Sequence, residues 1–172
     1  IIAAITAVVA FYLFVIDRNF SDFENRDFSA IPVSNTGDIG ELKITSASGV
    51  IVLQRDKKDK GSWKMTAPVN DRADAKQIEE LLAALVNLKK QQDIEGENSP
   101  SIEEMGLNDA DLELSLGGID GNKIGVLKFG NGAGFVDSVY ARWEEDTPFA
   151  CWSDVRLLAE VAHDALRDIR LL

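Results

Sequence analysis

The chain has 172 residues and a formal net charge of -11, and its first sixteen residues carry no charge. The remainder of the chain is long enough for one domain with a hydrophobic core. The acidity excludes a nucleic-acid-binding class, because phosphate binding needs clustered Lys and Arg. We therefore expect no nucleic acid among the partners.

Residues 1–16, IIAAITAVVAFYLFVI, predict a transmembrane anchor. A spanning helix needs roughly 20 apolar residues, so this run is slightly short, but the chain begins at Ile1 rather than Met and we expect more residues upstream. Two alternatives are a buried core helix and a cleavable signal peptide. No small-x-small cleavage site comes after the run, which favours a retained anchor.

Residues 17–40 are interpreted as a juxtamembrane connector, in which Phe20, Phe23 and Phe28 alternate with acidic and amide residues. We expect these rings to contact the lipid bilayer or other integral membrane protein subunits. The connector has few cations to hold it in the cytoplasm. The predicted arrangement is a single-pass protein of the bacterial inner membrane with a periplasmic C-terminal domain.

Residues 41–172 are predicted to form a soluble domain. Its first half, 41–94, shows strand-like alternation at 41–45 and 50–55, then a short strand that opens at Trp63 and ends at Pro68. A helix is predicted next, from Asp74 to Leu88, with Asp74 as the cap. Its buried stripe is predicted from apolar spacing and consists of Ile78, Leu81, Leu82, Leu85 and Leu88.

The second half, 111–172, repeats this order loosely. Strands are predicted at 111–116, 123–129, 138–143 and 149–152. Ser153 is predicted to cap a second helix, whose inner face consists of Val155, Leu158, Ala162, Ala165 and Leu166. Antiparallel hairpins succeeded by a packing helix, twice, predict an α+β fold with a candidate β-β-β-α repeat.

A family resemblance rests on the order of several motifs. Gly61-Ser-Trp-Lys-Met-Thr-Ala-Pro68 is followed by Ala73-Asp74 and a leucine-rich helix, and later by Leu127-Lys-Phe-Gly130 and Val139-Tyr-Ala-Arg142. This pattern resembles a bacterial family of domains of unknown function. The resemblance implies an envelope protein associated with auxiliary subunits of gliding-motility-type ABC transporters, and it implies no activity and no catalytic residues.

The glycine-rich stretch KFGNGAGF, residues 128–135, is the first candidate for chemistry. Its spacing is G-x-G-x-G, whereas a dinucleotide-binding loop has G-x-G-x-x-G between a strand and a helix. Here the next segment is itself a predicted strand, so no helix N-terminus is available to hold a phosphate. We interpret the stretch as a hairpin connection, whose flanking Phe129 and Phe135 are candidate partner contacts.

The sequence offers few other residues that could form a catalytic or metal-binding site. His163 has only Asp164 beside it in sequence, and one His with one Cys cannot complete a zinc site. The alternation Asp109-Ala-Asp111-Leu-Glu113 lacks the glycine of a calcium loop. Trp63, Trp143 and Trp152 are interpreted as packing residues rather than a ligand platform. We therefore predict no catalytic residue, no metal and no cofactor.

The sequence favours a non-enzymatic, single-pass membrane protein that serves as an accessory or structural subunit of a larger complex, such as a transporter or an energy-converting or photosynthetic assembly. No small-molecule substrate is predicted. The alternative is a periplasmic ligand-binding module associated with an ABC-type transporter, with a pocket between the two halves. The candidate partner contacts are Phe20, Phe23, Phe28, Phe129 and Phe135.

Overall fold

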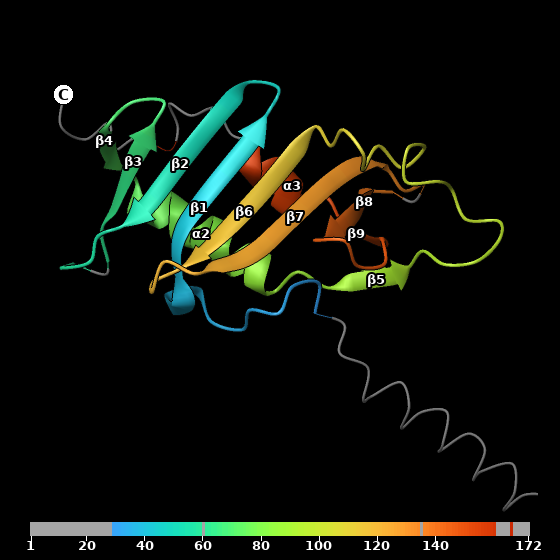
Figure 1. Ribbon diagram of the computed structural model, residues 1–172, viewed down its shortest axis with the longest axis horizontal. Coiled ribbons are helices and arrows are strands. Elements are labelled where there is room, and N and C mark those ends of the chain that lie inside the picture. The colour runs from blue at the N-terminus through green and yellow to red at the C-terminus, as the bar shows by residue number, and fades with distance from the viewer. Residues whose placement is uncertain (1–28, 60, 135, 161–165, 167–172) are drawn as a thin grey trace, which may run out of the picture.

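The computed structural model describes residues 29–59, 61–134, 136–160 and 166. One antiparallel sheet of nine strands, in the order β4-β3-β2-β1-β6-β7-β8-β9-β5, dominates this part of the chain (Figure 1). The strands are β1 (Ile39–Ser46), β2 (Gly49–Arg55), β3 (Trp63–Ala67), β4 (Asp71–Ala73), β5 (Lys90–Asp93), β6 (Leu112–Gly118), β7 (Lys123–Gly132), β8 (Ser138–Trp143) and β9 (Phe149–Trp152). The helices are η1 (Thr36–Asp38), a 3-10 turn, and the α-helices α2 (Ala75–Val86) and α3 (Asp154–Ala159).

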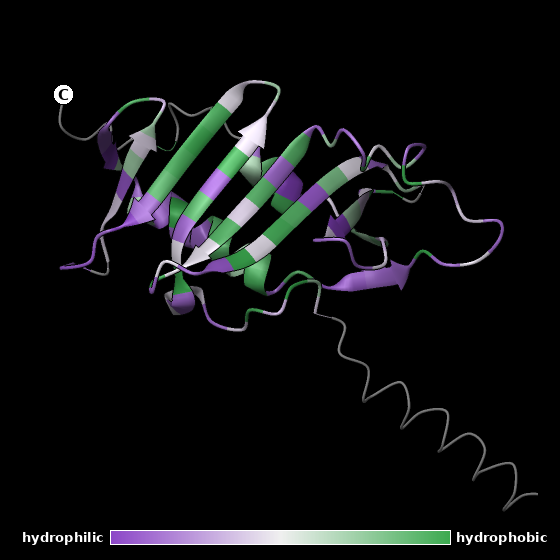
Figure 2. Cartoon of the chain, in the orientation of Figure 1, coloured by the Kyte–Doolittle hydropathy of each residue, from purple (hydrophilic) through white to green (hydrophobic). Residues whose placement is uncertain are grey.

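Both α-helices lie behind the sheet in Figure 1, so one face of the sheet is covered and the other faces the viewer. Alternation along the strands produces the two faces. In β1, Leu42 and Ile44 are buried while Lys43 between them is exposed. Figure 2 shows the same banding of hydrophilic and hydrophobic residues across the central strands. The main core therefore lies between the sheet and the helices.

The first helix forms at its predicted place with its predicted cap, but it ends at Val86 rather than at Leu88. The Asp74 side chain caps it by accepting hydrogen bonds from the backbone N–H groups of Lys76 and Gln77, at 3.0 and 3.4 Å. These bonds satisfy two of the donors that a helix start leaves without partners. The stripe predicted from apolar spacing is buried against the sheet; it comprises Ile78, Leu81, Leu82, Leu85 and Leu88.

The predicted β-β-β-α repeat is wrong. The strands of the two predicted halves join edge to edge, because β1 pairs with β6 along its whole length, with Leu42 opposite Leu116 and Ile44 opposite Leu114. A shared sheet buries these apolar rows in one core, which two separate hairpin-and-helix units would not do. The described part of the chain contains only two short α-helices against nine strands.

The second helix also differs from its prediction. α3 has six residues, and Ser153, the residue before the helix, makes no side-chain hydrogen bond that would cap it. Val155 and Ala159 face the core, but Leu158 is 39% exposed. Residues 162 and 165, predicted for the inner face, lie outside the described residues.

The predicted single-pass topology and inner-membrane localisation require correction. Among the described residues, no helix combines the length and the apolar character that a membrane crossing needs. The predicted span, 1–16, lies outside the described residues.

The end of the predicted connector belongs to the folded domain. Ala30, Ile31 and Val33 are buried in the main core. The backbone N–H of Ala30 donates to the carbonyl of Leu88 at 3.0 Å, just beyond the end of α2. Packing rather than an interfacial position therefore accounts for residues 30–33.

Candidate functional site

Within the described residues, one end of the sheet face opposite the helices is covered by another segment. Segment 101–107 lies against β7 there, and Met105 and Leu107 are both nearly fully buried. The backbone N–H of Asn131 donates to the carbonyl of Met105 at 2.8 Å, and the Asn131 side chain donates to the carbonyl of Glu104 at 3.0 Å. We call residues 101–107 the covering segment.

Gly130 allows the covering segment to approach this closely. A Cβ atom at Gly130 would lie only 2.1 Å from the Met105 carbonyl oxygen, a distance that no side chain can accept. The glycine stretch is therefore partly a packing site for another backbone segment. Residues 128–132 of the stretch belong to β7 itself, and the antiparallel strand β8 follows. The strand predicted after the stretch is thus confirmed, but most of the stretch is strand rather than connection.

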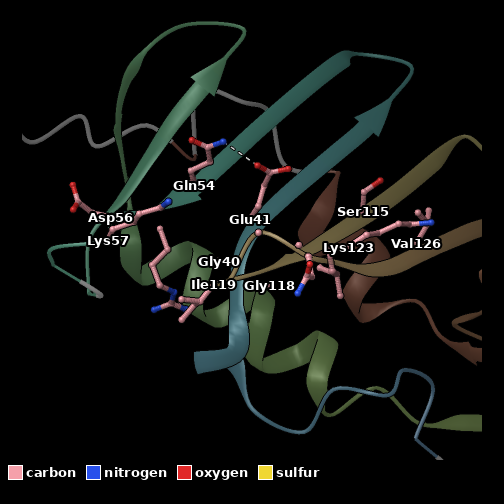
Figure 3. A pocket seen from close by; sticks show the side chains of 15 residues that line it. Gly40, Glu41, Gln54, Asp56, Lys57, Ser115, Gly118, Ile119, Lys123 and Val126 are labelled. Atoms are coloured by element: carbon pink, nitrogen blue, oxygen red, sulfur yellow. Dashed lines mark hydrogen bonds between the residues drawn. The ribbon is translucent and has the colours of Figure 1, made fainter.

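The rest of this face carries an open hollow of about 720 Å³. It lies over β2, β1, β6 and β7 and the turn that joins β6 to β7, so it spans the junction between the two predicted halves. Figure 3 shows polar side chains from both sides of this junction around the hollow, including Gln54, Glu41, Ser115 and Lys123. Ile119 and Val126 supply apolar surface.

The charges around the hollow are largely compensated. Gln54 Nε2 donates to Glu41 Oε2 at 2.9 Å, and Lys123 Nζ lies 2.8 Å from Glu144 Oε1. Asp56 Oδ2 lies 2.8 Å from Lys64 Nζ. This hydrogen bond from Lys64, together with weaker ones from the backbone N–H groups of Lys58 and Asp59, lowers the pKa of Asp56 from 3.8 to about 2. The hollow is thus polar without a strong excess of either sign.

A tight polar cluster anchors the wall of the hollow to α2. The Arg55 guanidinium lies 4.6 Å from the centroid of the Trp63 ring and 2.8 Å from Glu79 Oε1. Trp63 Nε1 donates to the same Glu79 oxygen at 3.0 Å, and Arg55 Nε donates to the carbonyl of Ile39 at 3.0 Å. Because these donors all meet protein acceptors, this cluster is a structural joint between β2, β3, α2 and the start of β1.

A second candidate site lies where β8, β9 and α3 meet. The three most exposed large apolar residues in the described part of the chain are Val136 (83%), Leu157 (61%) and Trp152 (52%). They are joined through Ser153, whose backbone N–H donates to the carbonyl of Asp137 at 2.9 Å and whose carbonyl accepts from Leu157 at 2.9 Å. We call these three residues the end cluster.

Of the five predicted partner contacts, one is buried and four lie outside the described residues. Phe129 is fully buried in the main core, because it alternates with Lys128 on the helix-facing side of β7, so it offers no surface to a partner. Phe20, Phe23, Phe28 and Phe135 lie outside the described residues. Sequence reasoning missed the end cluster. The only signal available was an apolar residue beside the glycine stretch and a tryptophan at the end of the last strand.

The remaining candidates give no catalytic arrangement in the described part of the chain. Cys151 is buried, and desolvation raises the pKa of its thiol to about 12, so it stays protonated. No group of three or more His, Cys, Asp or Glu side chains in the described ranges is placed to hold a metal ion. His163 lies outside those ranges. Trp63 and Trp143 are buried, as predicted for packing residues, whereas Trp152 is half exposed.

Comparison with known proteins identifies one relationship. Neither the curated proteins nor the solved structures include a significant match to the chain. A family described as a domain of unknown function (DUF4340) matches residues 63–150, which is half of the chain and runs from the start of β3 into β9. This agrees with the resemblance seen in the sequence, although it does not show an association with gliding-motility-type ABC transporters. The chain belongs to this family of domains of unknown function.

Proposed function

We propose that the domain is a non-enzymatic protein-interaction module, an accessory or structural subunit of a larger protein complex. The end cluster carries this proposal. Large apolar side chains scattered singly over a surface need no explanation, whereas several gathered at one place are typical of a docking site. Here the three highest exposures among large apolar residues fall within one hydrogen-bonded junction.

The construction of the site supports the same proposal. The end cluster lies on a rigid frame, because β8 and β9 pair over four residues and α3 is anchored through Val155 and Ala159 in the core. A rigid frame lowers the entropy cost of binding a partner. An ABC-type transporter of the gliding-motility class is one candidate for the complex, on the strength of the sequence resemblance alone.

The proposal is tested by mild isolation of the tagged chain from the organism that encodes it. We expect a protein to co-purify in a fixed ratio, and to be lost when Val136 and Leu157 are both replaced by Asp. Val69→Asp is the matched control, since Val69 is also an exposed valine (40%) but lies in the turn between β3 and β4. Isolation of the chain alone, as a monomer, would contradict the proposal.

A second candidate function is ligand binding in the hollow. It is favoured by the hollow's volume of about 720 Å³, which lies within the usual range for small-molecule sites. A ligand present at about 100 times its Kd would stabilise the fold by about 2.7 kcal/mol. Thermal denaturation with panels of metabolites and glycans tests this function. A ligand that stabilises the native chain but not a Ser115→Trp variant, in which an indole occupies the hollow, would support it.

A further inference from the structure

The loop between β7 and β8 exposes an apolar residue, Val136, to solvent. The N–H of Ala133 donates to the carbonyl of Ser138 at 3.1 Å, which closes the loop. Gly134 and Asp137 both have positive φ, at 79° and 53°. Asp is one of the few non-glycine residues that enter this region readily, so Asp137 suits a turn at this position. The result is a defined position for Val136, which is 83% exposed.

The side chains of the end cluster point in different directions from one end of the sheet. Trp152 lies opposite Ser138 in the sheet and alternates with Cys151, which is buried in the core, so its ring is on the face away from the helices. Leu157 lies on α3 between Val155 and Ala159, which face the core, so its side chain points away from the sheet on the other side. Val136 lies in the loop that enters β8 at the same end. The three apolar residues therefore surround one end of the sheet.

Carboxylates border this apolar end. Asp137, Asp154 and Glu160 are all exposed. The only cation in segments 136–138 and 152–160 is Arg156, and its guanidinium is engaged: Nε pairs with Glu160 Oε1 at 2.7 Å, and Nη1 donates to the carbonyl of Gly130. Asp137 and Asp154 thus present negative charge beside the end cluster.

We infer that the end cluster inserts into a concave apolar pocket on a different protein, and that Lys or Arg residues surround that pocket. The inference rests on the proposed interaction function and adds the shape and charge of the partner. Complementary charge at the rim steers association and excludes wrong partners. A second copy of this chain fits poorly, because it would bring two acidic borders together on chains that each carry a net charge of -11.

Site-directed photo-cross-linking tests the partner's identity. A benzoylphenylalanine is placed at position 136 of the full chain, in the organism that encodes it, and the same probe is placed at position 69 as the control. We expect position 136, and not position 69, to label one protein, at a peptide with aliphatic or aromatic residues beside Lys or Arg. Labelling of a second copy of the chain, labelling of an acidic peptide, or no labelling would overturn the inference.

Affinity measurements with the purified labelled protein test the two parts of the inference separately. Loss of a buried apolar anchor at an interface centre weakens binding by about 30-fold or more, so we expect that change for Val136→Asp and none for Val69→Asp. Asp137→Asn combined with Asp154→Asn should slow association and flatten its salt dependence. An unchanged salt dependence would contradict the inference that Lys or Arg residues surround the partner's pocket.

The outcomes also separate this inference from the proposed function. If a partner co-purifies in a fixed ratio but binds Val136→Asp as tightly as the native chain, the interaction function stands and the inference about the end cluster fails. If no partner co-purifies at all, the interaction function itself fails.

Discussion

The two ends of the outer face of the sheet, which is the face opposite the helices, differ in whether another segment covers them. At the far end of β7, the covering segment lies on Gly130 and buries Met105 and Leu107. Over β2, β1, β6 and the start of β7, nothing in the described part of the chain covers the face, and polar side chains border a hollow of about 720 Å³. Both ends contain glycines, so composition alone does not separate them.

The difference shows what covering a sheet face requires. At the covered end, Gly130 lets a backbone approach, Asn131 supplies two hydrogen bonds to that backbone, and Met105 and Leu107 bury apolar surface in return. At the hollow, Glu41 and Gln54 bond each other and remain accessible to water. A buried polar group without a partner is costly, so a segment that covered this region would have to supply hydrogen-bond partners for its polar side chains.

The largest effect is expected from Gly130→Ala. The added Cβ would lie 2.1 Å from the Met105 carbonyl, which forces the covering segment off β7, and overpacking of this kind costs about 1–3 kcal/mol. We expect a loss near the upper end of that range in urea denaturation. Gly132→Ala is the control, since its Cβ would stand 3.8 Å from its nearest neighbour. Equal losses for the two variants would contradict the packing role of Gly130.

Met105→Ala should have the next largest effect. Met105 is only 2% exposed, and its side chain belongs to the covered end. Truncation of a buried Met to Ala costs about 2–5 kcal/mol, and we expect the low end because the covering segment can settle onto the sheet. Hydrogen exchange should show faster exchange of the Asn131 amide, which bonds to the Met105 carbonyl. An unchanged exchange rate would mean that the segment is held by other contacts.

Ser115→Leu tests the uncovered end of the face, where a larger side chain should be tolerated. Ser115 lines the hollow and is half buried, between Lys43 of β1 and Val126 of β7. Because space is available there, we expect the free energy of unfolding to change by no more than about 0.5 kcal/mol, as at ordinary surface positions. Thermal denaturation measures this. A loss as large as that of Gly130→Ala would show that the hollow is less open than the structure indicates.

The smallest effect concerns acid. The pKa of Asp56, at the border of the hollow, is lowered from 3.8 to about 2 by Lys64 and two backbone donors. A lowered folded-state pKa contributes stability that is present above pH 3.8 and is lost as the pH falls toward 2. The group is fully exposed, so the contribution is small. Lys64→Met should raise the pKa of Asp56 toward 3.8 in an NMR titration. An unchanged pKa would show that the Lys64 hydrogen bond is not the main cause of the lowered value.

Much of the secondary structure could be predicted from the sequence. The apolar spacing from Ile78 to Leu88 and the cap at Asp74 located α2, since both signals are local. Strand alternation located β1, β2, β6, β7, β8 and β9 to within a few residues. The short polar strands β4 and β5 were missed, because Asp71–Ala73 and Lys90–Asp93 gain their structure from pairing with β3 and β9 rather than from their own residues.

The candidate site was far less predictable. Phe129 was expected to face a partner, yet its place in the alternation of β7 puts it in the core. Val136, Trp152 and Leu157 come from a loop, a strand and a helix, and the pairing of β8 with β9 and the hydrogen bonds through Ser153 bring them to one junction. Exposure is a property of the assembled molecule, so no local pattern marks these residues.

The sequence by itself determined the strand alternation, the capped helix and the strand that follows KFGNGAGF, because each depends on neighbours a few residues apart. Only the tertiary structure decided that the two predicted halves share one sheet, through the pairing of β1 with β6. It also decided that one end of the outer face is covered while the other stays open. The physical reason is that sheet pairing and the burial of a face depend on segments distant in sequence, whose meeting no local periodicity records.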